Sequence, residues 1–266
     1  MKKYIIFSFD DGREDTYRNA YKVLSDKSLP ATINVTSDFI LHEEKYTCFK
    51  SSCNKSMKIS EILECQKAGW EIACHGSKHQ NDVEDIVLNI SELEAFGVDV
   101  NNIGFASPNA EVTEDNCKDI HELLDNNTIA YIRSGRQTRR EGIWYSVWTI
   151  INQYLKSKYV YWCLNKRNIL YNNNKRFLYS VGISSYTTIK ELKYLISRIK
   201  KDEAIILVFH SILKECDRGY NLDKWYWDIE KFEELCDWIS HSSQFEVCTT
   251  KQWLELKGDK NHVESD

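Results

Sequence analysis

Short apolar segments rich in β-branched and aromatic residues alternate with segments of helical periodicity along most of the chain. The spacing, about 30 residues from one apolar segment to the next, is typical of βα units whose strands form a parallel sheet. Seven or eight such units are present. The predicted strands cover residues 4–9, 31–36, 70–74, 103–106, 128–133, 177–183, 204–209 and 245–248.

The intervening segments predict helices, and one stretch interrupts their rhythm. Residues 134–188 are rich in aromatic side chains and in Asn, Lys and Arg, and here we expect a long helix over 148–171. We expect one domain, residues 1–257, followed by a polar tail, residues 258–266. The other predicted helices are 15–29, 60–68 with Ser60 as N-cap and Gly69 as stop, 83–96, 114–124, 189–200, 229–239 and 251–256.

Polar residues gather where the predicted strands end. Asp10 and Asp11 follow the first strand, His75 the third, Pro108 the fourth and His210 a late one. The alternation alone also fits an open doubly wound sheet. A closed or nearly closed barrel is favoured, because the carboxyl ends of barrel strands converge on one face, where residues far apart in sequence meet.

Composition excludes some classes of function. The chain of 266 residues is 42% apolar with net charge −5, and its basic residues are scattered, so we do not expect nucleic-acid binding. It has no run of 18 apolar residues and no long apolar segment at its N-terminus, so we expect neither a transmembrane helix nor a signal peptide, and a cytoplasmic location.

Nine cysteines are present, an odd number, and none forms a Cys-x-x-Cys pair. Reduced thiols are therefore the favoured interpretation. The alternative is a local disulfide or metal site formed by Cys48 and Cys53, which lie in one polar loop.

The most specific motif is His-Gly-Ser-Lys-His, which places His75 and His79 four residues apart. One helical turn would bring both imidazoles to the same side, near enough to bind one cation. A carboxylate from the first strand would complete a site suited to Zn²⁺ and other divalent metals. Two surface histidines at chance spacing are the competing interpretation, which the position after a buried strand disfavours.

The paired aspartates and His210 also fit metal-assisted hydrolysis. Asp10-Asp11-Gly12 taken alone is equally typical of an ordinary turn. Adjacent strand residues point in different directions, however, so one carboxylate could bind the metal while the other takes a proton from water. His210 follows a continuous apolar run typical of a buried parallel strand. A core histidine is the alternative there, but its place at the strand's carboxyl end favours a role in the site.

Three segments resemble motifs of one family. They read FSFDDG at 7–12, GWEIACHGSKH at 69–79 and LVFH at 207–210. They are similar to the first, second and fifth motifs of the polysaccharide deacetylase family (NodB homology, carbohydrate esterase family 4), in the family's order and spacing. Residues 30–35 resemble its second strand, and the resemblance covers about residues 3–254.

The resemblance implies a distorted (β/α)7–8 barrel and metal-dependent removal of an N-acetyl group from an amino sugar or glycoconjugate. An N-acetylated saccharide is then the expected partner. One divalent ion is implied, with Zn expected and Co, Mn or Ni as alternatives. The implied roles are Asp10 as general base, Asp11, His75 and His79 as metal ligands, His210 as the acid that protonates the leaving amine, and a backbone N–H near Asn109 as oxyanion donor.

The sequence departs from the family in two places. The third motif, often Arg-Pro-Pro-Tyr-Gly, reads Ala-Ser-Pro-Asn-Ala at 106–110, so the arginine that orients the base is missing. Arg13, Arg133 or Arg136 could replace it. The fourth motif, an Asp with a Trp that tunes the catalytic His, is not evident. The catalytic core looks intact and its surroundings altered.

Aromatic residues offer stacking surfaces for a sugar. Trp225 and Trp227 follow His210 by a short loop and are the preferred candidates, and Trp144, Tyr145 and Trp148 are others. Core packing is an equally good interpretation. Two other functions stay open: a C–N hydrolase acting on a small non-sugar amide, which the altered motifs favour, and a catalytically weakened sugar-binding protein, which the complete metal and base residues disfavour.

Overall fold

A computed structural model describes residues 2–45, 55–135, 142–171, 176–217, 219–222 and 224–263. Its centre is a nine-stranded sheet in which every paired strand is parallel, in the order β6-β5-β4-β3-β2-β1-β8-β7, with β11 beside β1. The strands are β1 (Lys3–Asp11), β2 (Thr32–Val35), β3 (Glu71–Cys74), β4 (Phe105–Ala106), β5 (Ile132–Ser134), β6 (Phe177–Tyr179), β7 (Val181–Gly182), β8 (Ala204–Phe209) and β11 (Phe245–Val247).

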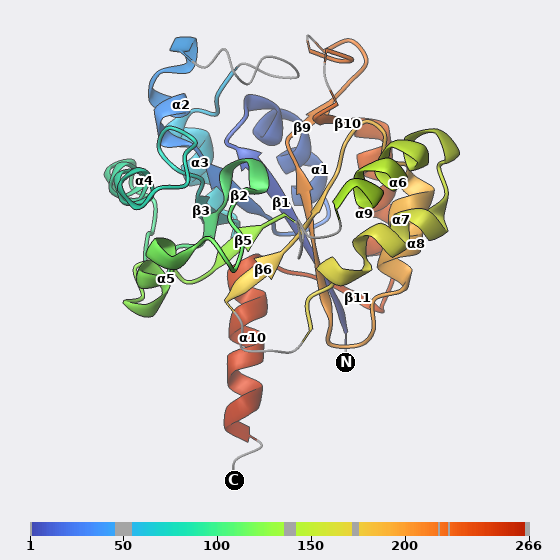
Figure 1. Cartoon of the computed structure of the whole chain (residues 1–266). Coiled ribbons are helices and arrows are strands. Elements are labelled where there is room, and N and C mark those ends of the chain that lie inside the picture. Colours follow the sequence, from blue (N-terminus) through green and yellow to red (C-terminus); the bar gives the residue numbers. More distant parts are fainter. Residues whose placement is uncertain are drawn as a thin grey trace.

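The sheet closes through one extended segment. Only Ser180 separates β6 from β7, yet β6 pairs with β5 at one edge of the sheet and β7 pairs with β8 at the other. Residues 177–182 therefore join the two edges, and the sheet is a nearly closed barrel (Figure 1). The expected (β/α)7–8 barrel is confirmed, and an open doubly wound sheet is excluded.

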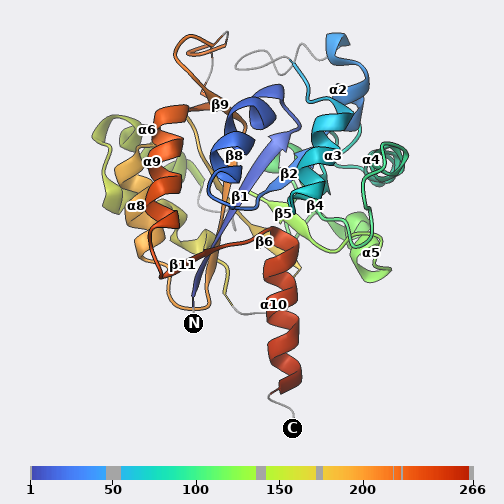
Figure 2. The same ribbon diagram turned by 180° about the vertical axis from the view of Figure 1, so that it is seen from behind.

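Helices surround the barrel on two sides. In Figure 1, α3, α4 and α5 lie on one side of the barrel and α6 to α9 on the other. The helix α10 projects from the end of the barrel opposite β9 and β10. Figure 2 shows the same arrangement from the opposite side. The helices are η1 (Thr16–Tyr21), α1 (Lys22–Ser25), α2 (Ser37–Leu41), η2 (Glu43–Lys45), α3 (Ile59–Lys67), α4 (Val83–Ala95), η3 (Pro108–Ala110), α5 (Lys118–Asp125), α6 (Gly142–Leu155), α7 (Lys158–Asn165), η5 (Lys166–Asn168), α8 (Ile189–Ser197), α9 (Ile229–Ser240) and α10 (Thr250–Val263), and a short pair of strands, β9 (Ser211–Leu213) and β10 (Tyr226–Asp228), follows β8.

The alternation of side chains along β1 sets the two cores and the site. Ile5, Phe7 and Phe9 belong to the outer cluster between the barrel and the helices, whereas Tyr4 and Ile6 belong to an inner cluster. Because side chains alternate with a period of two, Ser8 and Asp10 continue the inner row toward the carboxyl end of the strand. Trp253 of α10, 1% exposed, packs into the inner cluster.

Several local expectations need correction. Lys58, not Ser60, is the N-cap of α3, although Gly69 follows that helix with a φ of 86° as expected. The helix expected over 148–171 is two helices, α6 and α7. Lys156 has a φ of 50°, and the Ser157 hydroxyl accepts a hydrogen bond from the Val160 amide, so the first helix ends and a second begins.

The C-terminal helix α10 reaches Val263, beyond the expected 251–256 and into the residues for which we expected a polar tail. Within the ranges that the structure describes, no helix combines the length and apolar character needed to cross a bilayer. The seven described cysteines are free thiols, and Cys48 and Cys53 lie outside the described residues.

Candidate metal and catalytic site

A cavity of about 410 Å³ lies at the carboxyl ends of the barrel strands, and its size suits a small-molecule site. Active sites of β/α barrels sit at this face. Nine residues to which the sequence analysis gave possible roles line this cavity: Asp10, Asp11, Arg13, His75, His79, Asn109, Arg133, His210 and Trp225.

Both carboxylates of the Asp10-Asp11 pair reach the same cavity, although strand alternation would send them in different directions. The reason is the backbone of Asp11, whose φ is 79°, followed by Gly12 at 78°. A left-handed conformation at a residue other than glycine costs about 1–3 kcal/mol and persists where the surroundings hold it. Here the Met57 amide donates to the Gly12 carbonyl oxygen at 2.8 Å, and the Thr36 amide donates to that of Asp11 at 3.3 Å.

His75 and His79 are brought together by a tight loop and not by the expected helical turn. Gly76 has a φ of 73° and His79 a φ of 60°. The carboxylate of Asp85, in the first turn of α4, accepts hydrogen bonds from the amides of Lys78 at 2.9 Å and Gln80 at 3.0 Å. A Cβ at Gly76 would lie 2.5 Å from Asp85 Oδ2, so this loop requires glycine.

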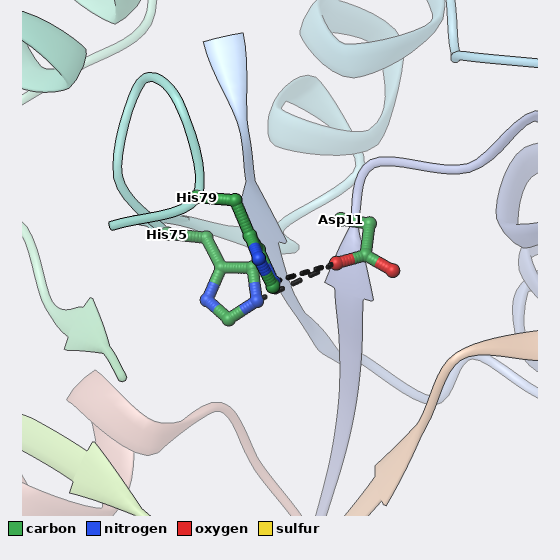
Figure 3. Close-up of side chains that lie close together, drawn as sticks. All are labelled: Asp11, His75 and His79. Atoms are coloured by element: carbon green, nitrogen blue, oxygen red, sulfur yellow. Dashed lines mark ion pairs between the residues drawn. The ribbon is translucent and has the colours of Figure 1, made fainter. Parts of the chain in front are cut away.

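Three ligand atoms converge in the cavity. Asp11 Oδ1 lies 3.5 Å from His75 Nε2 and 3.6 Å from His79 Nε2, and Figure 3 shows both imidazoles directed at this oxygen. Among the described residues, Asp11 Oδ1 is buried without a hydrogen-bond partner. His75 Nδ1 lies 2.8 Å from the Ala106 carbonyl oxygen, which fixes the ring and leaves Nε2 free to bind a metal.

One carboxylate oxygen and two imidazole nitrogens are a donor set that suits Zn²⁺ and other divalent first-row metals. A buried carboxylate oxygen that lacks any donor needs a cation or a proton. The residues present therefore fit one divalent metal ion, held by Asp11, His75 and His79.

Two buried arginines stand beside the two carboxylates. Arg133 of β5 donates from Nη2 to Asp10 Oδ1 at 2.5 Å, and Asn34 Nδ2 donates to the same oxygen at 2.7 Å. Arg13 donates from Nε and Nη2 to Asp11 Oδ2, each at 2.8 Å. Of the three arginines considered for the missing third-motif arginine, Arg133 therefore contacts Asp10, Arg13 contacts Asp11, and Arg136 lies outside the described residues.

These contacts set the charges of the carboxylates. Burial alone raises the pKa of Asp10, but the attraction of Arg133 and of the nearby imidazoles outweighs it, so the pKa lies below its ordinary value. Burial acts on Asp11 in the same way, and Arg13 and His75 hold the pKa of Asp11 well below the ordinary range. Both carboxylates are therefore ionised at neutral pH.

Burial lowers the pKa of two imidazoles in the cavity, those of His79 and His210. Burial, reinforced by His75, lowers the pKa of His79 to about 4. Burial also lowers the pKa of His210, against the opposing attraction of Asp11 and Asp10. Neutral imidazole is the form that binds metal, so His79 is in its ligating form at neutral pH.

His210 directly follows β8, and no described side chain orients its ring through Nδ1. In the described part of the chain this nitrogen is buried and has no hydrogen-bond partner, which agrees with the absence of a recognisable fourth motif. The Trp225 ring packs against it, with ring centroids 4.9 Å apart.

The strand after His210 is held by Arg13 and by a residue that the sequence analysis did not single out, Asp15. Ser211 Oγ accepts from Arg13 Nη1 at 3.1 Å and lies 3.2 Å from Asp15 Oδ1, and the Ile212 amide donates to Asp15 Oδ2 at 2.6 Å. Asp15 is 0% exposed. The sequence near Asp15 does not show that this carboxylate is buried, because its partners Ser211 and Ile212 lie almost 200 positions away.

The two tryptophans expected to contact a sugar occupy different places. Trp225 is 39% exposed and lines the cavity. Trp227 is 1% exposed, packs against Phe209 in the outer core and donates from Nε1 to the Thr187 carbonyl oxygen at 2.9 Å. The expected substrate contact is therefore wrong for Trp227.

Comparison with known proteins gives a family match for the first part of the chain and structural matches for nearly all of it. The family model described as polysaccharide deacetylase matches residues 1–128, which confirms the resemblance over the part of the chain that carries the first two motifs. No curated protein matches the sequence.

Solved structures match over nearly the whole chain. A family 4 acetyl xylan esterase from Clostridium thermocellum, in complex with a cobalt ion, has a TM-score of 0.53 at 15% identity over 96% of this chain and 92% of its own. Peptidoglycan deacetylase PdaC from Bacillus subtilis has a TM-score of 0.53 at 12% identity over 99% and 95%. A 4-alpha-glucanotransferase from Thermococcus litoralis has a TM-score of 0.54 at 12% identity over 96% and 40%. At such identities the likeness establishes the fold, and function has to be argued from the site.

Proposed function

Because the polysaccharide deacetylase model matches residues 1–128, we propose that the chain is a metal-dependent hydrolase that removes an N-acetyl group from an amino sugar or glycoconjugate. One observation carries the proposal. Asp11 Oδ1, buried and without a hydrogen-bond partner among the described residues, faces the Nε2 atoms of two histidines, and a second ionised carboxylate, Asp10, lines the same cavity.

Asp11, His75 and His79 would hold the cation, and Zn²⁺ matches this donor set best. A divalent ion there supplies polarisation of the acyl carbonyl and lowers the pKa of water. Arg13 contributes by engaging Asp11 Oδ2, which leaves Oδ1 directed at the histidines.

Asp10 would take the proton of the attacking water. Both of its described hydrogen bonds, from Arg133 and Asn34, go to Oδ1, so Oδ2 is the oxygen for that proton. His210, directly after the neighbouring strand β8, would give a proton to the amine nitrogen as the C–N bond breaks; the donor is the imidazolium form, which the charges of Asp11 and Asp10 favour and burial disfavours.

Two further residues would handle the acyl group and the sugar. The Ala110 amide already donates to the Ser107 carbonyl oxygen at 3.1 Å, so we assign the oxyanion contact to the backbone N–H of Asn109. The half-exposed ring of Trp225 would stack on the sugar beside His210.

The test is acetate release from N-acetylglucosamine, acetylated chito-oligosaccharides and simple acetamides. The protein is assayed after chelation and after reloading with Zn²⁺, Co²⁺, Mn²⁺ or Ni²⁺. We expect acetate from at least one saccharide, lost on chelation and restored by metal. Release from simple amides alone would replace the sugar by a small amide, and metal binding without any release would leave a binding protein.

A further inference from the structure

The helix α6 is polar on the side that faces the protein and apolar on the side that faces solvent. Its inner side carries four residues with hydroxyl or amide groups, Tyr145, Thr149, Asn152 and Gln153, which line a small cavity against α7. A surface helix is ordinarily held to the core by burial of its apolar stripe. Because α6 shows the reverse arrangement, we expect its outer side to contact a partner other than water.

Six large apolar side chains are exposed on α6 and at the start of α7, two helices that pack against each other. Those on α6 are spaced by four and seven residues, so they fall in two rows on the same side of the helix. Among the described residues fourteen large apolar side chains are exposed, so nearly half of them lie between positions 144 and 159. Exposed apolar surface gathered in this way marks an interaction site. The six residues, termed the α6 patch, are Trp144, Trp148, Ile150, Tyr154, Leu155 and Tyr159.

The catalytic cavity does not account for the α6 patch. The sequence made Trp144 and Trp148 candidate stacking surfaces for a sugar, yet no residue of the patch lines the cavity that contains Asp10 and His210. Figure 1 shows α6 and α7 on the flank of the barrel. The patch is therefore a surface feature that needs an explanation of its own.

The patch lies in a basic segment of an acidic protein. The Lys158 and Lys166 ammonium groups lie over the Tyr159 and Trp162 rings, with Nζ 5.4 Å and 5.0 Å from the ring centroids. Residues 142–168 contain no Asp or Glu and four basic residues, Lys156, Lys158, Lys166 and Arg167. These four charges leave a net charge of −9 on the rest of a chain whose total is −5. Positive charge therefore borders the aromatic side chains of the patch.

This combination of aromatic rings and positive charge selects among the surfaces that could cover the patch. In a symmetric dimer the same face of both copies meets, so two basic faces would be brought together. An anionic lipid bilayer instead attracts basic residues, and Trp and Tyr rings are favoured in its headgroup layer. Lysine stems can also lie along apolar surface while the ammonium group reaches the headgroups. An anionic bilayer thus fits the patch better than a second copy of the chain.

We propose that the α6 patch, with its basic border, docks the protein on the surface of a bilayer that contains anionic lipids. The 14 residues of α6 span about 21 Å, whereas the hydrocarbon core of a bilayer is roughly 30 Å thick. The helix therefore lies along the membrane surface, with its apolar side in the headgroup layer and its polar side toward the barrel. This binding activity goes beyond the proposed hydrolysis and does not depend on it.

Vesicle flotation of the full chain tests the proposal. The vesicles consist of phosphatidylcholine alone or of an equimolar mixture with phosphatidylglycerol, and the readout is the bound fraction of the protein. We expect binding to the anionic vesicles that weakens as salt screens the lysines, and little binding to phosphatidylcholine alone. The double variant Trp144→Ser/Tyr154→Ser should lower the partition coefficient about tenfold or more, since both side chains are largely exposed, 74% and 84%. Lys158→Gln/Lys166→Gln should lower it about fivefold for each charge removed.

The matched controls replace exposed residues of similar kind outside the patch. Leu88→Ser changes an exposed leucine of α4, on the opposite side of the barrel (Figure 1). Lys22→Gln changes an exposed lysine of α1. Both control variants should bind the anionic vesicles as the wild type does.

Three results would overturn the proposal. One is no binding to anionic vesicles at low salt, and another is equal binding by the patch variants and the controls. The third is a lipid-free dimer in sedimentation velocity that Trp144→Ser/Tyr154→Ser dissociates, which would assign the patch to a second copy. Because flotation measures no turnover, absence of acetate release would count against the proposed function alone.

Discussion

Arg133 donates a 2.5 Å hydrogen bond to Asp10 across 123 positions of the sequence, and both side chains are almost fully buried. In the family's usual pattern an arginine of the third motif orients the base. Here the neighbouring strand of the barrel, β5, supplies the guanidinium while the third motif carries alanine. The charge beside the base is thus provided from another element.

Arg133→Ala should lower kcat about 10- to 100-fold, the usual effect of removing a group that orients a catalytic side chain, and should leave KM and metal content almost unchanged. The reason is that Asp10 loses both its orientation and its countercharge. Added guanidinium ion should restore part of the rate. Arg198→Ala, an exposed arginine that stacks on Trp162, is the control. If guanidinium ion does not restore the rate and the variant has also lost its metal, Arg133 supports only the fold.

Removal of the metal should destabilise the protein. An ion that binds only the folded state adds about 2.7 kcal/mol at a concentration 100 times its Kd. We therefore expect zinc to raise Tm by about 5 °C or more over the chelated protein, in thermal scans with and without the ion. His79→Gln should lose this response. The control is His241→Gln, which replaces an exposed histidine outside the cavity and should keep the rise in Tm with zinc.

Much of the fold and the ends of its strands could be predicted from sequence. The buried run at β8 has the predicted bounds, and β1, β2 and β3 lie within two residues of theirs. Apolar periodicity is a local property, and it also places Asp10, His75 and His210 at one face once the barrel closes. The motifs also named Asp11, His79 and Asn109, which line the same cavity.

The features that the sequence did not predict depend on contacts between residues far apart in the chain. The pairing of Arg133 with Asp10, and of Asp15 with Ser211, joins residues more than 100 positions apart and leaves no local pattern. The left-handed backbone at Asp11 is imposed by its neighbours in space. Trp225 lies just before β10 and Trp227 lies within it, and the two differ in exposure (39% against 1%) although a spacing of two residues in one extended strand would place both on the same face.

The histidine loop gives a prediction with an internal control. Gly76 and Gly69 both have positive φ, 73° and 86°, but a Cβ would lie 2.5 Å from Asp85 Oδ2 at Gly76 and would meet nothing within 4 Å at Gly69. Either alanine variant should lose about 1–2 kcal/mol of unfolding free energy from backbone strain. Gly76→Ala should lose more and should also weaken zinc affinity.

Calorimetric zinc titration and chemical denaturation of both alanine variants separate the two effects. Equal zinc affinity in Gly76→Ala and Gly69→Ala would show that the loop does not position His75 and His79.

Glu71 predicts a pH-dependent stability term far from the cavity. Burial raises the pKa of this carboxyl above its ordinary value of 4.5, although it accepts bonds from Thr32 Oγ1, Tyr131 Oη and the Lys251 amide. A raised folded-state pKa gives stability that is complete below pH 4.5 and is lost as pH rises through the folded-state value. Glu71→Gln keeps an acceptor and removes the titration.

The unfolding free energy of Glu71→Gln minus that of the wild type, measured by urea denaturation, should therefore increase as pH rises from about 4 to about 8. Asp237→Asn, whose carboxylate lies on an exposed surface beside Lys27 and has a lowered pKa, supplies a contrasting control. A difference that stays constant with pH would contradict the assignment.

His210 makes the sharpest prediction about the reaction, because an acid matters in proportion to the basicity of the leaving group. His210→Asn removes the proton donor, and loss of a positioned acid typically costs about 10²- to 10⁴-fold. Hydrolysis of an N-acetyl sugar expels a poor leaving amine and should show this loss in kcat. Hydrolysis of 4-nitrophenyl acetate expels a phenolate that needs no proton and should fall far less. Steady-state kinetics on both substrates at equal zinc content measure the contrast, and parallel losses would show that His210 binds substrate or shapes the cavity instead of donating a proton.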